Sequence, residues 1–258
     1  MSQPEPPCPP SPPPIDTRPL EAVIVCDHYA DFLQQTLPHN KFLFEKIVVV
    51  TSYEDKDTRR ICEYNHVECI PTDVLEVRKG NFCKGAGINV GLEALSMKGW
   101  VVHLDADIYL PPQTKLLLEL ARLDPTMLYG IDRFIVRGWA NWQAFLEKPR
   151  LLHEDETWVH MTSGFPVGTR VMHKHQGGWM PIGFFQLWNP NGSGISRYPE
   201  GHTGAGREDT IFAGLWPRAK RGFIPEVVGY HLESEDAGHA SNWNGRKTAP
   251  FSFQPQKA

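Results

Sequence analysis

The chain has 258 residues, of which 41% are hydrophobic and 22% are charged. These proportions are ordinary for a globular protein, and the length suffices for one substantial domain or for one domain with a smaller annex. A formal net charge of −4 provides no overall attraction to nucleic acids or other polyanions. No apolar run approaches the roughly 18–20 residues that a membrane-spanning helix needs.

The first 19 residues contain nine of the 23 prolines, so we predict an extended, disordered tail over residues 1–19. This stretch lacks the basic segment followed by apolar residues that marks a signal peptide. The five cysteines are odd in number and form no Cys-x-x-Cys pair. Both features favour a reducing compartment, and we expect a cytoplasmic protein without a zinc–cysteine site.

Between residues 20 and 130, short apolar runs alternate with stretches of helical periodicity. Strands are expected over residues 22–26, 47–50, 67–70 and 100–104. Their uninterrupted, β-branched character is typical of strands covered on both faces. Helices are expected over residues 31–37 (ended by Pro38), 55–65, 83–97 and 113–123. The alternation predicts an α/β fold with a mostly parallel central sheet and helices on both faces.

The pattern changes after residue 130. Residues 131–206 contain most of the tryptophans and many glycines but little periodicity, so we predict a loop-rich region beside the sheet. A strand is expected over residues 223–228, with the segment Tyr230-His-Leu232 directly after it. The chain then becomes rich in Gly, Asn, Ser and His, and we predict that residues 233–258 form a flexible tail or a lid.

An acidic triplet, Asp105-Ala106-Asp107, follows the strand expected at residues 100–104. In parallel α/β sheets, ligands bind beyond the carboxyl ends of the strands. Residues i and i+2 of an extended stretch point the same way, so both carboxylates can face one site. Two carboxylates suit a hard cation such as Mg²⁺ or Mn²⁺. The alternative is a pair of solvated turn residues, because such triplets also occur by chance.

The surroundings of this triplet, a buried strand before it and Pro111-Pro112 after it, resemble the metal-binding motif of GT-A glycosyltransferases. The resemblance is to the inverting family-two enzymes and their galactosyl- and N-acetylgalactosaminyltransferase relatives. Further segments are similar to motifs of this family, in the same order: His28-Tyr-Ala-Asp-Phe-Leu33 (with Ala30 in place of the usual Asn), Thr51-Ser-Tyr-Glu-Asp-Lys-Asp-Thr58 (with Thr51-Ser52 in place of an Asp pair), Lys84-Gly-Ala-Gly-Ile-Asn89, Gly206-Arg-Glu-Asp-Thr-Ile-Phe212 and Tyr230-His-Leu232. Together they span residues 22–110 and 204–232.

The resemblance implies a GT-A (Rossmann-like) fold, with residues 20–130 as the nucleotide-sugar-binding half and residues 131–232 as the acceptor-side, catalytic half. It implies that Mn²⁺ or Mg²⁺ is held by Asp105, Asp107 and His231. The donor contacts that it implies come from Cys26, Tyr29, Asp57, Lys84, Asn89 and Asp105. It further implies that Asp209 is the general base and that Glu208 orients the acceptor hydroxyl. The alternative for this acidic pair is interaction with a helix dipole.

The function expected from these residues is inverting transfer of a sugar from a nucleotide-diphosphate-sugar, in the first place a UDP-sugar, to an acceptor hydroxyl. A glycan, a protein, a small molecule and a hydroxymethylated DNA base are all compatible acceptors, and no specific protein partner is indicated. Two alternatives stay open. A nucleotidyltransferase would usually carry a glycine-rich basic loop after the first strand, where this chain has Asp27-His-Tyr-Ala-Asp31. A non-catalytic binding module would not need both acidic pairs.

Overall fold

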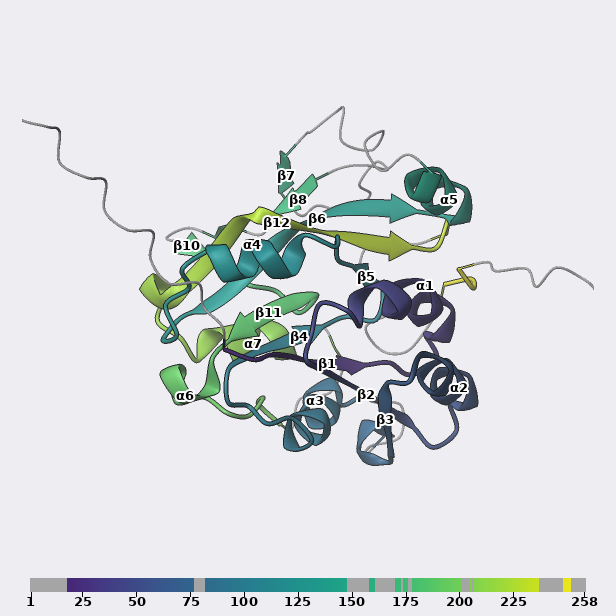
Figure 1. Ribbon diagram of the computed structural model, residues 1–258, viewed down its shortest axis with the longest axis horizontal. Coiled ribbons are helices and arrows are strands. Elements are labelled where there is room, and N and C mark those ends of the chain that lie inside the picture. Colours follow the sequence, from purple (N-terminus) through teal and green to yellow (C-terminus); the bar gives the residue numbers. More distant parts are fainter. Residues whose placement is uncertain are drawn as a thin grey trace, which may run out of the picture.

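The computed structural model describes residues 18–76, 82–147, 158–160, 170–172, 174–175, 178–200, 205, 207–236 and 248–251. A ten-stranded sheet forms its centre, and eight of these strands follow one another in a single path (Figure 1). In spatial order they are β3 (Glu68–Thr72), β2 (Lys46–Ser52), β1 (Leu20–Val25), β4 (Trp100–Leu104), β11 (Phe185–Trp188), β6 (Leu128–Arg137), β12 (Arg221–Glu233) and β5 (Ile108–Tyr109). The other two, β7 (Trp158–His160) and β8 (Arg170–Met172), join at β6, and β9 (Lys174–His175) pairs separately with β10 (Gly178–Trp179).

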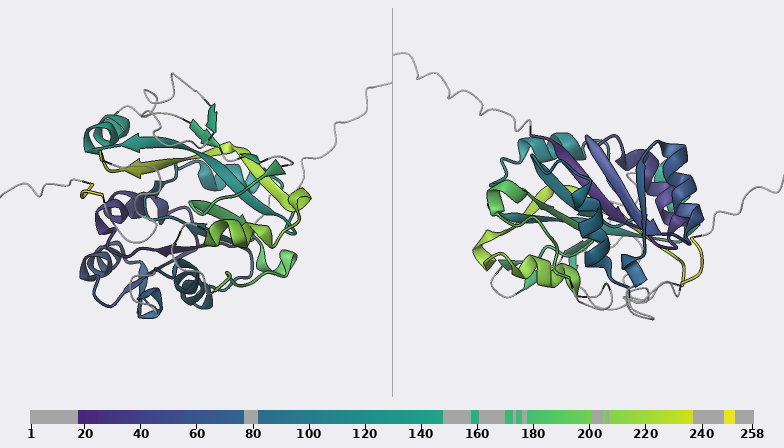
Figure 2. Two further views of the ribbon diagram at one scale, coloured as in Figure 1. Left: turned by 180° about the vertical axis from the view of Figure 1, so that it is seen from behind. Right: turned by 90° about the horizontal axis from the view of Figure 1, so that it is seen from below.

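Helices pack on both faces of this sheet (Figure 2). The face that contains Leu33, Cys62 and Leu118 is covered by α1, α2 and α4. The opposite face is covered by α3 and α7, which contribute Ile88 and Phe212 to a second core. The helices are α1 (Ala30–Asn40), α2 (Lys56–Asn65), η1 (Val74–Glu76), α3 (Lys84–Glu93), α4 (Thr114–Leu120), α5 (Trp139–Glu147), α6 (Pro190–Ser193), α7 (Glu208–Gly214) and η3 (Arg218–Lys220).

The first four strands form the parallel part of the sheet. β1 runs parallel to both β2 and β4, and β2 runs parallel to β3. In β1, Ala22 and Ile24 pack into the core on one face, whereas Val23 and Val25 pack into the core on the other. Because successive side chains of a strand alternate between faces, a strand covered on both sides is apolar at nearly every position; the exception in β1 is the buried Glu21. The predicted fold class, α/β with a mostly parallel central sheet and helices on both faces, is confirmed.

The last four strands of the path are mixed in direction. β11 runs antiparallel to both β4 and β6, β6 runs parallel to β12, and β5 pairs antiparallel with β12. β5 follows the acidic triplet almost directly, and Ile108 pairs in register with His231. The backbone N–H of Leu232 also donates to the Asp107 carbonyl oxygen at 2.9 Å. This topology therefore brings β12 against the carboxyl end of β4.

The region predicted to be loop-rich, residues 131–206, begins with two elements that periodicity did not reveal. β6 has ten residues, all buried except Arg137, and α5 follows it and packs on β6 and β12 through Trp142 and Phe145. The strand was missed because Asp132 and Arg133 interrupt its apolar run, yet both are buried. Residues 148–157 and 161–169 of this region lie outside the described residues.

Two element boundaries also differ from the prediction. β12 continues to Glu233, so Tyr230, His231 and Leu232 lie within the strand and not after it. α1 continues through Pro38 to Asn40. Pro38 lies near the end of the helix, and the bond from Lys41 N to Leu37 O still forms after it at 3.1 Å.

Most of the predicted terminal tails, residues 1–17, 237–247 and 252–258, lie outside the described residues. Residues 248–251 pack against α1. The Phe251 ring stacks on Phe32 with ring centroids 4.9 Å apart, and its backbone N–H donates to the Asp31 carboxylate at 2.5 Å. Among the helices that the structure describes, none has both the length and the apolar character of a membrane span.

Candidate functional site

The acidic triplet forms a tight turn that other segments hold in place. The Asp105 N–H donates to Phe184 O at 3.1 Å, and the Ile108 N–H returns to Asp105 O at 3.2 Å. Thr36 of α1 donates its hydroxyl to Ala106 O at 2.6 Å. The side chains of Asp105 and Asp107 retain 28% and 19% of their exposure. Both side chains are thus held just beyond the end of β4 and are partly exposed.

The two carboxylates have different partners. Asp105 Oδ1 forms an ion pair with Lys84, the first residue of α3, whose side chain is only 13% exposed. Burial raises the pKa of Asp105, and the attraction of Lys84 only partly offsets this effect. Burial lowers the pKa of Lys84, but the charges of Asp105, Asp209 and Asp107 outweigh burial and raise it overall. The Lys84 ammonium therefore forms its ion pair with Asp105 and stays charged under the additional negative charge of Asp107 and Asp209.

Asp107 pairs with His231, which lies 124 residues away in the chain. Asp107 Oδ2 is 3.1 Å from His231 Nε2. Burial raises the pKa of Asp107, but the charge and hydrogen bond of His231 outweigh it and lower the pKa overall. Within the described part of the chain, Asp107 Oδ1 and His231 Nδ1 are buried without a hydrogen-bond partner.

An unsatisfied buried carboxylate oxygen beside an imidazole fits a divalent cation with oxygen and nitrogen ligands, such as Mn²⁺. Asp107 and His231 could hold such an ion. Asp105 does not form a compact group of three with them, and its Oδ1 forms the ion pair with Lys84. The structure thus brings two of the three predicted metal ligands together and places the third beside them.

The predicted catalytic pair opens α7, and its two members are placed differently. Glu208 is buried, and its Oε2 accepts the Gly85 N–H at 2.5 Å. Burial raises the pKa of Glu208 to about 7. Asp209 is half-buried, and its oxygens accept the N–H groups of Gly183 at 2.8 Å and Thr210 at 2.7 Å. Each carboxylate oxygen has a second lone pair, so Asp209 is oriented yet still able to accept a proton.

Three of the predicted donor-binding residues are engaged in structural contacts. Cys26 is buried at the end of β1, 3.3 Å from the Thr58 hydroxyl, and burial raises the pKa of its thiol well above the usual value. Asp57 is exposed on α2, where it pairs with Arg60. Asn89 is buried in α3 and exchanges hydrogen bonds of 3.0 and 2.8 Å with the Tyr198 backbone. None of these three contacts involves Lys84, Asp105 or Asp107.

Tyr29, a fourth predicted donor contact, stands at the amino end of α1. Its ring is half-buried and stacks on Phe32 with centroids 5.6 Å apart. This leaves part of the ring at the carboxyl end of β1, where the resemblance implies a nucleotide base. Its role as a donor contact stays a prediction.

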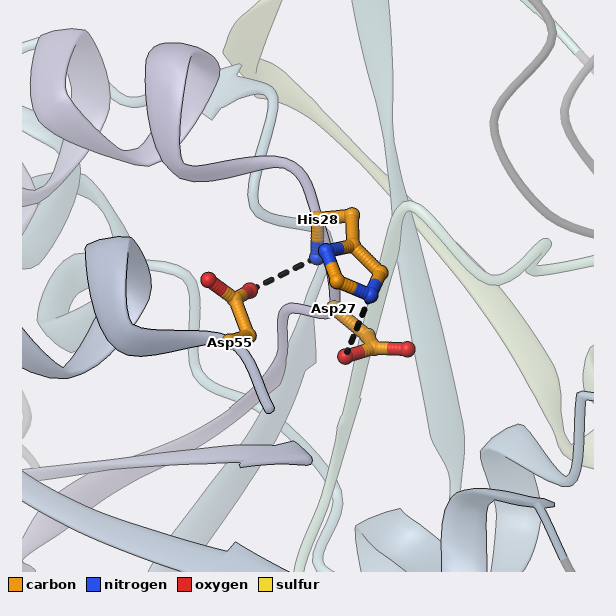
Figure 3. A group of neighbouring side chains, drawn as sticks. All are labelled: Asp27, His28 and Asp55. Atoms are coloured by element: carbon orange, nitrogen blue, oxygen red, sulfur yellow. Dashed lines mark hydrogen bonds and ion pairs between the residues drawn. The ribbon is translucent and has the colours of Figure 1, made fainter. Parts of the chain in front are cut away.

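Sequence reasoning overlooked the acidic groups that follow β1 and β2. Asp27, His28 and Asp55 each offer a ligand atom within 4.8 Å of the others (Figure 3). The Asp55 carboxylate, however, accepts the His28 N–H at 2.7 Å and the Thr58 N–H at 3.0 Å, so it caps α2. Asp27 accepts the Ser52 hydroxyl at 2.5 Å. The Asp-x-x-Thr capping pattern was the available signal, and these contacts explain the cluster as loop structure.

A buried polar chain, also overlooked, connects β4 with α7. His103 is fully buried in β4, and its Nδ1 lies 3.1 Å from the Tyr198 hydroxyl. That hydroxyl donates to the Gln186 side chain, which in turn donates to the Asp209 carbonyl oxygen at 3.0 Å. Burial lowers the pKa of His103 well below the usual value, so the ring is neutral. In the sequence, the only local indication of this hydrogen-bonded network was the histidine inside the apolar strand Trp100–Leu104.

Comparisons with known proteins concern the fold. No protein-family model matches the chain, and no curated protein matches it. A mannosyl-3-phosphoglycerate synthase from Rubrobacter xylanophilus is 17% identical, with a TM-score of 0.36 over 45% of this chain and 41% of that one. A mycobacterial protein is 14% identical, with a TM-score of 0.46 over 84% of this chain and 66% of that one. This chain thus spans less than half of the first of these structures.

A third similar structure is a glucosyl-3-phosphoglycerate synthase from Mycobacterium tuberculosis, in complex with Mn²⁺, UDP-glucose and phosphoglyceric acid. It is 14% identical, with a TM-score of 0.43 over 83% of this chain and 72% of that one. The fold assignment for the present chain rests on its own strand order and register, described above.

Proposed function

We propose that this protein is a metal-dependent glycosyltransferase that moves a sugar from a nucleotide-diphosphate-sugar, in the first place a UDP-sugar, to an acceptor hydroxyl. The observation that carries the proposal is the Lys84–Asp105 ion pair next to the Asp107–His231 pair, with the charge of Asp209 also acting on Lys84. These residues come from α3, β4, β12 and α7. Such a convergence of buried charges beyond the end of a sheet strand is typical of a catalytic site.

Each residue has a role that its contacts support. Asp107 and His231 would hold the divalent cation, Mn²⁺ or Mg²⁺, which when bound stabilises negative charge on a departing diphosphate. Lys84 holds Asp105 in position and adds positive charge at the same place. Asp209 would accept the proton of the acceptor hydroxyl while that oxygen forms its bond to the anomeric carbon. The bond from this carbon to the diphosphate oxygen breaks, and attack from the opposite side inverts the configuration.

Glu208 has a different role in this proposal from the one that the resemblance implies. Its buried carboxyl group contacts Gly85 and so joins the start of α7 to the start of α3. A β-carbon at Gly85 would lie 2.5 Å from Pro199 O and 3.4 Å from the Glu208 side chain, so this close approach requires glycine. We propose that Glu208 positions Asp209 relative to Lys84, whereas orientation of the acceptor by Glu208 stays a prediction.

The decisive experiment is a thermal-shift panel of UDP-glucose, UDP-galactose, UDP-N-acetylglucosamine and GDP-mannose, each with Mn²⁺. A donor at about 100 times its dissociation constant stabilises the folded state by about 2.7 kcal/mol, which raises the Tm of a protein of this size by about 5–10 °C. The stabilisation should disappear when EDTA replaces Mn²⁺ and should weaken in Asp107→Asn. Slow hydrolysis of the stabilising donor without an acceptor would then establish the activity.

The same panel discriminates the alternatives. A non-catalytic module would be stabilised by a donor but would not hydrolyse it, and it would transfer no sugar in acceptor screening. A nucleotidyltransferase would instead release pyrophosphate from a nucleoside triphosphate and a sugar phosphate. If no nucleotide-sugar changes the Tm and none is hydrolysed, the proposed function is wrong.

A further inference from the structure

A second cation, Arg133, acts on the charge of Asp107, as the α3 lysine does. It stands in the middle of β6 and pairs in register with Gly229 of β12. Two residues further along, Ile135 pairs with His231. In adjacent parallel strands, residues in register share a face, as do residues i and i+2. Arg133 and His231 are therefore diagonal neighbours on one face of the β6–β12 pair, and Gly229 between them has no side chain.

The Arg133 guanidinium is buried without the partners that such a group normally has. The residue is only 7% exposed. Within the described part of the chain, its Nε is buried without a hydrogen-bond partner. Its contact is with the face of the Phe184 ring, whose centroid is 4.5 Å from Cζ. Phe184 is the residue whose carbonyl oxygen holds Asp105 in position.

Nearby carboxylates attract this guanidinium without satisfying it. Burial lowers the pKa of Arg133, and the charges of Asp107, Glu233 and Asp105 act against that effect. Arg137, on the same strand and face, provides the contrast. Its Nε and Nη2 both donate to Glu233 Oε2, at 3.1 and 2.8 Å. Glu233 is thus occupied by Arg137, and Arg133 is left with unused donors beside Asp107.

A buried charge without hydrogen bonds destabilises the folded protein. Such a charge is therefore rare unless a bound ligand supplies the missing hydrogen-bond partners. The guanidinium presents five donors in a planar fork, whose geometry matches the two oxygens of a carboxylate or phosphate. It also keeps its charge at every physiological pH. An anionic ligand group between Arg133 and the Asp107–His231 pair would satisfy these donors.

We infer that Arg133 binds a phosphate or carboxylate group of a substrate at the β6–β12 side of Asp107. For its place in the reaction, the inference rests on the proposed function, but the anion site itself does not. Two sources share this chemistry: the diphosphate of the nucleotide-sugar, and an anionic group on the acceptor. If the second source is correct, Arg133 selects acceptors that carry a phosphate or carboxylate.

The test uses three variants of the full chain: Arg133→Gln, Arg133→Lys and, as a matched control, Arg137→Gln. Calorimetric titration measures two probes, UDP with Mn²⁺, and inorganic phosphate added to protein already saturated with UDP and Mn²⁺. Phosphate is also titrated without nucleotide. Loss of a charge-assisted hydrogen-bonded pair corresponds to about a 10- to 100-fold weaker binding. Arg133→Lys keeps the charge but loses the fork, so we expect a smaller loss.

The outcomes separate the two sources. Weaker binding of UDP with Mn²⁺ in Arg133→Gln assigns the site to the donor diphosphate. Weaker binding of phosphate to the UDP-saturated protein assigns it to an acceptor anion. Arg137→Gln should bind both probes like the wild type. The inference is overturned if Arg133→Gln binds every probe like the wild type, or if the wild type binds neither.

A stability readout separates a ligand site from a structural role. Because Arg133→Gln removes a buried charge whose Nε has no hydrogen bond, its ligand-free Tm should be equal to or above that of the wild type. A Tm well below the wild type, with unchanged anion binding, would show a purely structural role. Should Arg133→Gln fail to fold, Arg133→Lys carries the binding test.

The proposed function can fail independently. A wild type that binds phosphate through Arg133, but is stabilised by no nucleotide-sugar, would contradict the glycosyltransferase proposal and leave the anion site intact. Conversely, Arg133-independent binding of UDP and phosphate would remove the anion site and leave the glycosyltransferase proposal intact.

Discussion

The two groups of strands that meet at β4 are built in different ways. In β1 and β2, every position between Ala22 and Val25 and between Ile47 and Val50 is apolar and buried. In β6, by contrast, Asp132 and Arg133 are buried in the centre of the strand. The first group is stabilised mainly by apolar burial on both faces, and its one buried carboxylate in β1, Glu21, accepts hydrogen bonds from Ser96 and Met97. The second group contains buried charges in the middle of a strand, which burial alone destabilises.

This difference separates strands that contribute mainly to stability from strands whose buried polar groups contribute to the candidate site. Buried polar groups are retained when they are paired or functional. Among the polar groups of β6, β11 and β12, His231 and Arg133 act on Asp107 of the acidic triplet, and Gln186 contacts α7. We therefore expect substitutions in the first group to affect mainly stability, and substitutions around the second group to affect mainly activity.

The largest expected effect tests the activity side of this comparison. Asp209→Asn should slow sugar transfer by about 10²- to 10⁴-fold, because the amide cannot accept the acceptor proton. Its affinity for UDP with Mn²⁺, measured by calorimetry, should be unchanged. Asp73→Asn, a change at an exposed residue, is the control and should retain full activity. Substantial turnover by Asp209→Asn would mean that another group is the base.

A large effect on stability is expected in the first group. Leu33 of α1 is fully buried against the face of β1 that bears Ala22 and Ile24. Leu33→Ala should lower the free energy of unfolding by about 2–5 kcal/mol, because it removes buried methyl groups and leaves a cavity. Urea unfolding measures this loss. Leu116→Ala, at a site that is 53% exposed, should change it by less than about 0.5 kcal/mol.

The third effect depends on pH. Burial raises the pKa of Glu208 from 4.5 to about 7. Between these values the folded protein keeps a proton that the unfolded chain has lost, so stability falls as the pH rises through this range. The difference corresponds to at most about 3 kcal/mol. Glu208→Gln should match the wild type in urea unfolding at pH 5 and exceed it at pH 8. Parallel pH profiles of the two proteins would contradict this account.

The smallest effects compare two neighbouring aspartates. Asp55→Ala removes the cap of α2 and should reduce the free energy of unfolding by about 0.5–2 kcal/mol. Asp57→Ala removes only an exposed pair with Arg60 and should change it by less than about 0.5 kcal/mol. Urea unfolding of both variants checks this order. Equal losses would show that the helix cap is not what Asp55 contributes.

Much of the fold was predictable because local periodicity determines it. The apolar runs around Val23, Val49 and Val102 identified three neighbouring parallel strands, and the stripe containing Ile88 and Leu92 identified α3. β6 was not predictable in this way, because Asp132 and Arg133 break its pattern. Their burial depends on neighbours such as Phe184 and Gly229, which lie about 50 to 100 residues away in the chain.

The candidate site likewise has features that the sequence predicts and features that it does not. The sequence by itself determined that Asp105 and Asp107 follow a buried strand and that Glu208 and Asp209 form an acidic pair. Only the tertiary structure decided their partners: Lys84 for Asp105, His231 for Asp107, and Gly85 for Glu208. The spacing of apolar residues along the sequence predicts which face of a helix or strand is buried. The pairing of charged side chains depends on the order and register of the strands in the sheet. Contacts between segments that are distant in the sequence determine this order and register.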